Sequence, residues 1–354
     1  MSVRYGLIGC GMMGREHLRN LAAIDGTRVT ALADPIGEMR EQALREADGA
    51  ASFADHRDLL ASGLVDALII ASPNHTHAPV LEDVLAGDLP VLVEKPLCTT
   101  SLDCRRIEAM ARDRRAPVWV AMEYRYMPPI ARLIEEVRQG TAGRPRMLAI
   151  REHRFPFLRK VGDWNRFARN TGGTLVEKCC HFFDLMRLVL QAEPVRVHAS
   201  GAQDVNHLDE CYGGERPDII DNAFVIVEFD NGTRAMLDLC MFAEASRDQE
   251  EIALTGDAGK IECGIPSSTL VIGRRAPVER MGESLPLHRE TIAVDPAVRA
   301  LGDHHGSTYF QHRRFLEMLR SGGRPEVTVH DGAMAVAMGE AGEHSIREHR
   351  PIDL

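Results

Sequence analysis

Residues 174–184, TLVEKCCHFFD, bring two acids, a lysine, two cysteines and a histidine into one short stretch. On a helix, Glu177, His181 and Asp184 stand at i, i+4 and i+7 and share one stripe, with Cys179 on the opposite, apolar side. Imidazole titrates near neutral pH, so His181 is the natural proton acceptor for a hydroxyl group. A carboxylate on the same stripe would orient the ring. The stretch therefore predicts a helix that carries proton-transfer chemistry through His181 and Glu177.

A structural interpretation of the same stretch stays open. Thr174 to Glu177 reads T-x-x-E, the pattern of a capping box, in which Glu177 would serve the helix terminus. The binding role and the capping role do not exclude each other. Asp184 could pair with a helix neighbour such as Lys178 or Arg187.

Thiol and metal chemistry fit this stretch less well. Cys179 lies with the aromatic side chains, and Cys180 has no base beyond His181. Adjacent cysteines rarely bridge each other, and Cys-Cys-His in sequence points three ways around a helix, whereas helical metal ligands need i, i+4 spacing. We predict no metal site. The eight cysteines form no C-x-x-C pair, which favours reduced, mostly buried thiols in a cytoplasmic protein.

A second chemically capable segment is VLVEKPL, residues 91–97. Lys95 follows an apolar strand, where its ammonium group could donate to a reacting oxygen. Pro96 fixes its own φ and allows a cis bond that would aim Lys95 inward. The alternative is a surface lysine paired with Glu94.

The N-terminal segment VRYGLIGCGMMGREHL supplies a candidate nucleotide site. An apolar strand comes first, G-x-G-x-x-G follows, and a helical pattern comes after it, which is the context that this otherwise weak motif requires. Its glycines permit a tight turn, a close approach of pyrophosphate and close helix–strand packing, with the anion on the helix N-terminus. The motif comprises Gly9, Gly11, Met12, Met13 and Gly14.

The next predicted strand, RVTALADP, ends in Asp34, twenty residues after Gly14. A carboxylate there accepts hydrogen bonds from ribose hydroxyls and repels a 2′-phosphate. Asp34 could instead be only a strand-end turn residue, and Arg40 is the reason for caution about the phosphate. The spacing favours NAD over NADP.

Strands and helices alternate up to residue 122, and the strands are almost wholly apolar. This pattern predicts a parallel α/β sheet covered on both faces, whose ligand lies at the carboxyl ends of the strands. SPNHTH at 72–77 lies at such an end. Beyond 122 the segment 222–242 predicts two strands joined at Asn231-Gly232, and 250–263 predicts another hairpin. We therefore predict a Rossmann domain, residues 1–122, followed by an α+β domain with a mostly antiparallel sheet, residues 123–354.

Composition excludes several classes of partner. The formal net charge of −10 argues against nucleic acid, which needs a basic face. The sequence has no apolar run long enough for a membrane helix, and its N-terminal residues do not resemble a signal peptide.

Together these segments resemble the Gfo/Idh/MocA oxidoreductases. The resemblance rests on GCGMMG, SPNHTHAP, EKP at 94–96, YRYMP at 124–128, the GG…H…D stretch at 172–184 and the C-terminal RPEVTVHDGAMAVAMGEAGEHSIREHRPIDL, in this order. It implies a Rossmann domain, an open sheet covered by another subunit, and hence a homodimer or homotetramer. It also implies that His181 is catalytic and that the residue four positions earlier contacts substrate. Relatives carry Asp-x-Gly-x-His there, whereas this chain has Glu177 and two cysteines, a departure that bears on the substrate.

The expected function is an NAD-dependent dehydrogenase that oxidises a ring secondary hydroxyl of a sugar or cyclic polyol through Lys95 and His181. Alternatives are a hydrolase or epimerase with permanently bound NAD, and a non-catalytic sugar-sensing regulator, which would be expected to lack one of the two residues. Ser72, Asn74, His77 and Glu94 are further candidate cofactor contacts. The candidate substrate contacts, beside Lys95, Glu177 and His181, are Arg125, Tyr126, Asp163, Trp164, Asn165, Arg166 and His305.

Overall fold

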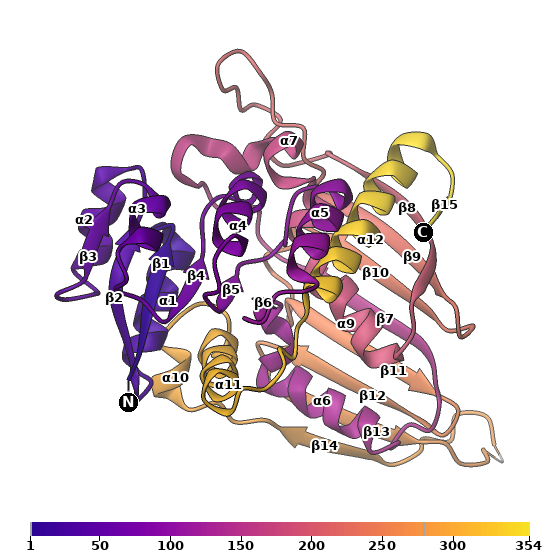
Figure 1. Ribbon diagram of the computed structural model, residues 1–354. Coiled ribbons are helices and arrows are strands. Elements are labelled where there is room, and N and C mark those ends of the chain that lie inside the picture. Colours follow the sequence, from indigo (N-terminus) through magenta and orange to yellow (C-terminus); the bar gives the residue numbers. More distant parts are fainter. Residues whose placement is uncertain (1, 279) are drawn as a thin grey trace. The chain divides into compact units, whose positions relative to one another are not determined.

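The computed structural model describes residues 2–278 and 280–354 and divides the chain between two units (Figure 1). Each unit combines segments that are distant in sequence. Unit 1 comprises Met1–Tyr126, Arg169–Gly172 and Asp295–Ala337, and unit 2 comprises Met127–Ala168, Gly173–Val294 and Met338–Leu354. The predicted domains follow chain order, whereas unit 1 also takes in two later segments.

Unit 1 contains the predicted parallel sheet, with strand order β3-β2-β1-β4-β5-β6. The strands are β1 (Val3–Ile8), β2 (Thr27–Ala33), β3 (Ala51–Phe53), β4 (Ala67–Ile70), β5 (Val91–Val93) and β6 (Val118–Val120). Every residue of β4, β5 and β6 is buried, which explains their continuous apolar sequences. The strand order reverses between β1 and β4, so the crevice for a ligand is expected beyond the carboxyl ends of these two strands.

The helices of unit 1 come from both ends of the chain. They are α1 (Met12–Ala22), α2 (Gly37–Leu44), α3 (His56–Ala61), η1 (Asn74–Thr76), α4 (His77–Leu85), α5 (Ser101–Ala111), η2 (Glu123–Tyr126), α10 (Pro296–Arg299) and α11 (Ser307–Ser321). Helix α11 packs against α1 and η2, and Phe315 lies edge-on to Trp119 of β6. The late segment 295–337 is thus part of the core of unit 1.

Unit 2 contains the predicted open sheet, with strand order β14-β13-β12-β11-β7-β10-β9-β8-β15. The strands are β7 (Pro145–His153), β8 (Pro194–Ala202), β9 (Asn222–Phe229), β10 (Arg234–Cys240), β11 (Glu250–Gly256), β12 (Gly259–Ile265), β13 (Thr269–Arg274), β14 (Leu287–Thr291) and β15 (Ile352–Asp353). Both predicted hairpins are confirmed, as β9–β10 and β11–β12. The pair β7–β10 is parallel and the other pairs are antiparallel.

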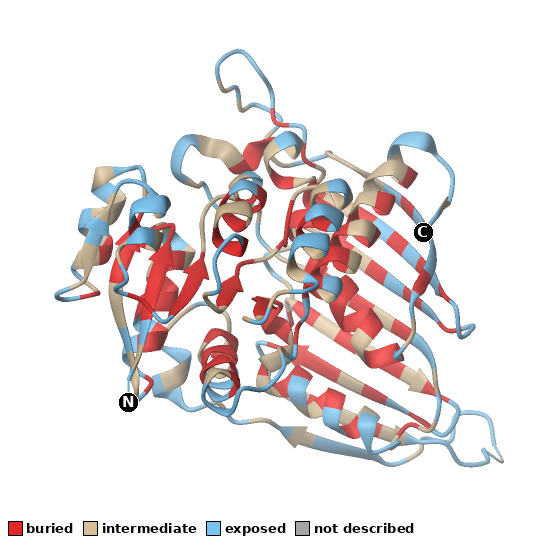
Figure 2. Ribbon diagram, viewed as in Figure 1, coloured by how far each residue is buried: buried red, intermediate tan, exposed pale blue. Residues whose placement is uncertain are grey.

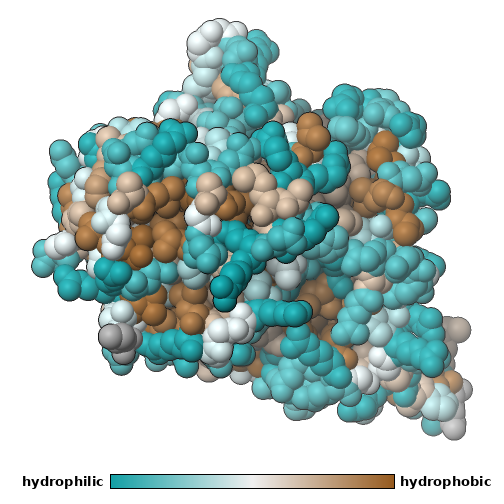
Figure 3. Space-filling model, in the orientation of Figure 1, coloured by the Kyte–Doolittle hydropathy of each residue, from teal (hydrophilic) through white to brown (hydrophobic). Residues whose placement is uncertain are grey.

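One face of this sheet is covered by helices and the other is not. Helix α6 (Pro128–Arg138) packs on β12 and β13, and α9 (Cys180–Leu190) packs on β7. Buried and exposed residues alternate along β9, as Figure 2 shows. The uncovered face presents Phe224, Ile226 and Met236, whose exposed fractions are 61%, 50% and 40%. On the side seen in Figure 3, hydrophobic patches are separate from one another and surrounded by hydrophilic residues.

Four shorter or shared helices complete the chain. They are η3 (Val161–Arg166), α7 (Ala168–Thr171), α8 (Thr174–Glu177) and α12 (Val329–Glu348). The residues of α12 up to Ala337 belong to unit 1, and those from Met338 belong to unit 2. Within unit 2, α12 places Glu343 at the start of α8, where the carboxyl accepts a hydrogen bond of 2.9 Å from the Leu175 amide.

Gly173 should be the glycine of this region whose replacement by a larger residue costs most stability. Its φ and ψ of 95° and 170° suit glycine almost alone, and a Cβ would lie 2.3 Å from Oε1 of Glu343. We expect Gly173→Ala to lower the free energy of unfolding by roughly 3 kcal/mol or more, measured by urea denaturation. Gly162→Ala is the matched control, because it has φ of 70° but nothing within 4 Å of its Cβ. The control should cost only about 1 kcal/mol, and equal costs would contradict the clash.

Candidate active site

The glycine loop of unit 1 leaves room for an anion at its middle glycine. A Cβ on Gly9 would lie 2.5 Å from the backbone of Ala71, and a Cβ on Gly14 would lie 2.1 Å from the Gly9 carbonyl oxygen. These two glycines are therefore required by the packing of the protein itself. A Cβ on Gly11 would meet nothing within 4 Å. The open space lies at the N-terminus of α1, where a pyrophosphate would be stabilised by free amides and the helix dipole.

Asp34 is fastened beside this loop. Its carboxylate accepts hydrogen bonds from the amides of Cys10 and Ile36, both at 2.8 Å. A carboxylate has about four acceptor positions, so Asp34 keeps capacity for ribose hydroxyls. The Arg40 guanidinium donates to the Asp34 backbone carbonyl at 2.6 Å, which ties this cation to the protein.

The loop after β4 is held by His77, which is fully buried. The ring nitrogens of His77 lie 2.8 Å from the Pro96 carbonyl oxygen and 3.0 Å from that of Ser72. His77 therefore ties the loop at 72–77 to the segment that carries Lys95. Asn74, in the same loop, has a buried Nδ2 without a hydrogen-bond partner among the described residues. A buried amide donor of this kind fits a ligand that brings an acceptor.

Lys95 lies directly after β5 and is half-buried. The Lys95–Pro96 peptide bond is cis, the form that the sequence allowed. Glu94 is buried, with its Oε1 3.0 Å from Nε2 of His17. Burial alone would raise the pKa of Glu94, but the hydrogen bond and charge of His17, together with Lys95, lower it. Glu94 is thus an internal carboxylate rather than the surface partner of a surface lysine.

The groups described so far fit NAD. The space at Gly11 suits its pyrophosphate, Asp34 suits a ribose, and the buried amide of Asn74 suits an acceptor further along the cofactor. These residues belong to one unit and follow the carboxyl ends of β1, β2 and β4.

In unit 2 the stretch 174–184 departs from the predicted single helix. It forms α8 and α9, with Lys178 and Cys179 between them. The prediction that a polar stripe faces away from the core, opposite an apolar side, is wrong, because every residue from Thr174 to Asp184 is buried. Tertiary packing on all sides replaces the amphipathic pattern. Cys179 is buried as expected, and burial raises its pKa well above the ordinary value.

The capping-box interpretation of Glu177 is not what the structure forms. The N-cap of α8 is Gly173, and the Thr174 hydroxyl donates to the Ile220 carbonyl at 2.5 Å. Glu177 instead lies 3.1 Å from Nζ of Lys160. Nζ of Lys160 is also 4.5 Å from the centre of the Trp164 ring, a cation–π contact. Lys160 was missed by the sequence analysis, since no local motif marks it.

Lys178 is buried and has two buried carboxylates as neighbours, those of Glu152 and Glu250. Its Nζ lies 2.9 Å from Oε1 of Glu152, and both side chains are at most 5% exposed. Glu250 stands directly opposite Glu152 in the pairing of β11 with β7 and is also buried. Burial, and then the charge of Glu152, raise the pKa of Glu250 to about 7. This buried acid pair adjoins the segment that carries His181, and no sequence motif indicated it.

The loop expected to supply polyol contacts is largely engaged with the protein. Asp163 accepts a hydrogen bond of 3.0 Å from Nη2 of Arg159, and Nε of Arg166 donates to Glu210 at 2.8 Å. Nδ2 of Asn165 donates to the Leu158 carbonyl at 3.0 Å. The Oδ1 atom of Asn165 is buried and has no partner in the described part of the chain.

The remaining predicted substrate contacts lie in unit 1. Arg125 donates to the Glu326 carbonyl at 2.9 Å, and the Tyr126 hydroxyl donates to the Glu326 carboxylate at 3.0 Å. His305 is half-buried, with its pKa lowered by burial and then by Arg299. The structure thus anchors Arg125 and Tyr126 to the late segment 295–337, and their contact with substrate stays a prediction.

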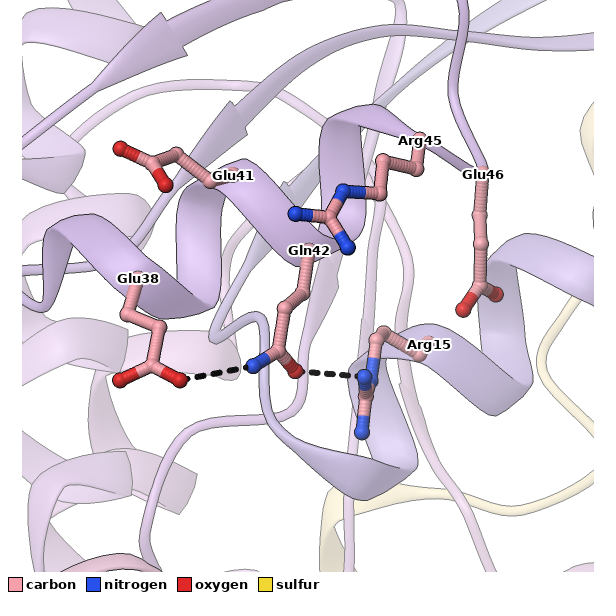
Figure 4. Close-up of a pocket in the computed structure, with 6 residues that line it drawn as sticks. All are labelled: Arg15, Glu38, Glu41, Gln42, Arg45 and Glu46. Atoms are coloured by element: carbon pink, nitrogen blue, oxygen red, sulfur yellow. Dashed lines mark hydrogen bonds between the residues drawn. The ribbon is translucent and has the colours of Figure 1, made fainter.

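A further hollow lies in unit 1. Figure 4 shows a hollow between α1 and α2 in which Arg15 and Glu38 each form a hydrogen bond with Gln42. Three further residues line it, namely Glu41, Arg45 and Glu46. Within residues 2–278 and 280–354, no group of three or more His, Cys, Asp or Glu side chains could hold a metal ion. No helix in those ranges is long and apolar enough to cross a membrane.

Comparisons with known proteins match the whole chain. Residues 3–122 match the family model described as "Oxidoreductase family, NAD-binding Rossmann fold", and residues 134–354 match "Oxidoreductase family, C-terminal alpha/beta domain". Myo-inositol 2-dehydrogenase of Thermotoga maritima is 26% identical, over 99% of this chain and 98% of that protein. Inositol 2-dehydrogenase 2 of Saccharopolyspora erythraea is 31% identical, over 76% and 75%. A levoglucosan dehydrogenase solved with NADH has a TM-score of 0.86 at 19% identity, covering 100% and 99%, which shows a shared fold.

Glu250 should make the stability of the protein fall as pH rises. Its pKa is raised to about 7 in the folded state, from an ordinary 4.5, so the folded protein binds more protons between these values and loses stability as pH increases. We expect Glu250→Gln to match the wild type near pH 5 and to exceed it at pH 8 by roughly 1–3 kcal/mol in urea unfolding. A constant difference at both pH values would argue against a buried titrating acid.

Proposed function

Because the chain belongs to the Gfo/Idh/MocA oxidoreductase family, we propose that it oxidises a ring secondary hydroxyl of a sugar or cyclic polyol with NAD. The observation that carries this proposal is the position of Lys95, a half-buried ammonium directly after β5 in the NAD-binding unit. The similarity to proteins named inositol 2-dehydrogenase supports an inositol-like substrate. The inositol comparison covers nearly the full length of both chains for the Thermotoga protein.

In this mechanism, the chain supplies binding and proton transfer. Bound NAD would supply the acceptor for the hydride that leaves the carbinol carbon. Gly11, Asp34 and Asn74 would hold it. Lys95 donates a hydrogen bond to the reacting oxygen and stabilises its developing negative charge. His181 accepts the hydroxyl proton, as imidazole can near neutral pH.

Glu177 and Lys160 extend this proposal to substrate binding. A carboxylate at 3.1 Å from an ammonium group forms a paired donor and acceptor that suits vicinal hydroxyls. The Trp164 ring beside Lys160 offers the flat apolar face that a sugar ring packs against. Glu177 is one methylene longer than the aspartate that relatives are expected to carry, so Lys160 and Glu177 together are the proposed determinants of which hydroxyl pattern is accepted.

The assembly and compartment are further parts of the proposal. We infer a homodimer or homotetramer formed through the uncovered sheet face, where Met236 stands opposite Ile226 in the β9–β10 pair. Hydrophobic side chains that are half exposed on neighbouring strands favour burial against a second copy. The described cysteines form no disulfide, which is typical of a reducing, cytoplasmic setting.

The catalytic proposal predicts a specific pattern of losses. With NAD and a panel of inositols and sugars, including myo-inositol, the wild type should release NADH, measured by absorbance. We expect Lys95→Ala and His181→Ala each to lower kcat by roughly 100-fold or more while NAD binding is retained, since the first removes the donor that stabilises the reacting oxygen and the second removes the proton acceptor. Retained turnover in either variant would refute the role of that residue. Reduction of tightly bound NAD without release of NADH would instead favour the hydrolase or epimerase alternative.

The assembly proposal predicts a change in molar mass. Ile226→Lys places a charge among the exposed hydrophobic residues of the uncovered face, so it should shift the protein toward smaller species in light scattering after size exclusion. Arg105→Ala alters an exposed residue of helix α5, away from this sheet, and should leave the mass unchanged. A monomeric wild type would contradict the proposal.

A further inference from the structure

Glu94 forms a hydrogen bond with one buried histidine of unit 1, and that histidine contacts a second one. Nε2 of His17, on α1, lies 3.0 Å from Oε1 of Glu94, and Nδ1 of His17 lies 2.8 Å from Nε2 of His312, on α11. The exposed fractions of His17, Glu94 and His312 are 0%, 4% and 0%. Oε2 of Glu94 is reached at 3.2 Å by the Lys95 amide. A continuous chain of hydrogen bonds therefore runs from α11 through α1 to the backbone of Lys95.

The hydrogens of this chain can be assigned by chemistry. Burial, and then the neighbouring His17, lower the pKa of His312 well below its ordinary value, which favours the neutral ring. An ionised carboxylate only accepts, so Nε2 of His17 must carry a proton and donate it to Glu94. Whichever tautomer His312 adopts, His17 serves Glu94 as a fixed donor.

Other charged groups of unit 1 also act on Glu94, but His17 lowers its pKa more than they do. Nδ1 of His304 lies 2.9 Å from Oε1 of Glu16, and its charge adds only weakly to the lowered pKa of Glu94. Glu123, of η2, has a pKa raised by burial and, after the effect of His304, by the charges of Glu94 and Glu16. The Thr308 hydroxyl lies within 2.9 Å of both Glu16 and Glu123 and has one hydrogen, so it can donate fully to only one of the two carboxyls. The neighbours that lower the pKa of Glu94 most are thus His17 and then Lys95.

We propose that His17, supported by His312, is a positioning residue for Lys95. It keeps the Glu94 carboxylate ionised and fixed next to Lys95, and the carboxylate in turn orients the Lys95 ammonium for catalysis. The inference rests on the proposed role of Lys95. His17 lies on the helix whose N-terminus forms the pyrophosphate site, so one side chain connects that helix to the catalytic lysine. Without this donor, burial dominates and Glu94 takes up a proton, and the charge beside Lys95 is lost.

Two substitutions of His17 separate its contacts. In His17→Gln the side-chain amide reaches the place of Nε2 and can still donate to Glu94. In His17→Asn the amide reaches only the place of Nδ1, toward His312. We expect His17→Asn to lower kcat with NAD and myo-inositol roughly 10- to 100-fold, with KM for both nearly unchanged, and His17→Gln to restore most of the loss.

A labelling experiment tests the same inference without turnover. Acetic anhydride modifies neutral amines, so loss of the carboxylate charge should make Lys95 react severalfold faster in His17→Asn and in Glu94→Gln, as read by peptide mass spectrometry. The double variant should add nothing further, because both changes act through one group. Exposed Lys260 is the internal reference.

Matched controls make the outcomes decisive. His56 bonds Asp83 at 2.8 Å elsewhere in unit 1, so His56→Asn removes a comparable histidine–carboxylate pair and should change neither kcat nor labelling. If His17→Asn does not fold, His312→Asn is the substitute variant, because it alters only the contact behind His17. It should lower kcat and raise the labelling of Lys95, each to a smaller extent. Unchanged labelling of Lys95 in His17→Asn, or equal loss in the Gln and Asn variants, would overturn the inference. Full turnover of Lys95→Ala would overturn the proposed function instead, and the labelling result would stand by itself.

Discussion

The carboxyl group of Glu343 determines how the segment that carries His181 can begin. The first amides of a helix need acceptors, and α8 starts in a buried place with glycine at its N-cap. Glu343 supplies the acceptor for the Leu175 amide from a different helix, and burial raises its pKa to about 7. Gly173 is the consequence of this arrangement, since any side chain there would occupy the place of the carboxyl. The position of α8, and with it Glu177, depends on this contact across the sequence.

Features of the fold with local causes were predictable from the sequence. The glycine loop, the apolar parallel strands and the Asn231-Gly232 hairpin each depend on residues adjacent in the chain, and all three are present. The break between α8 and α9 was not predicted, because Lys178 and Cys179 have no helix-breaking character of their own. Lys178 keeps a helical backbone, with its amide bonded to the Thr174 carbonyl at 2.9 Å, and its side chain pairs with Glu152, a partner 26 positions earlier that local periodicity cannot reveal.

The candidate site divides in the same way. Lys95, His181 and Asp34 are predicted site residues because strand ends and motif spacing mark them. Lys160, His17 and His312 were not, since their importance comes only from what they contact in the folded chain. The capping motif at Thr174 shows the converse case. The T-x-x-E pattern is present, but the Thr174 hydroxyl donates to the Ile220 carbonyl, an acceptor from a distant segment, and does not cap the helix.

The thiol of Cys10 has a consequence for chemical durability. It lies inside the glycine loop, where burial and then the charge of Asp34 raise its pKa to about 12. Peroxides and electrophiles attack the thiolate, and almost none exists at such a position at neutral pH. The Asp34 carboxylate, which accepts a hydrogen bond from the Cys10 amide, therefore adds to the protection from oxidation that burial gives the sulfur. A cysteine can occupy the second position of this loop without becoming a site of inactivation.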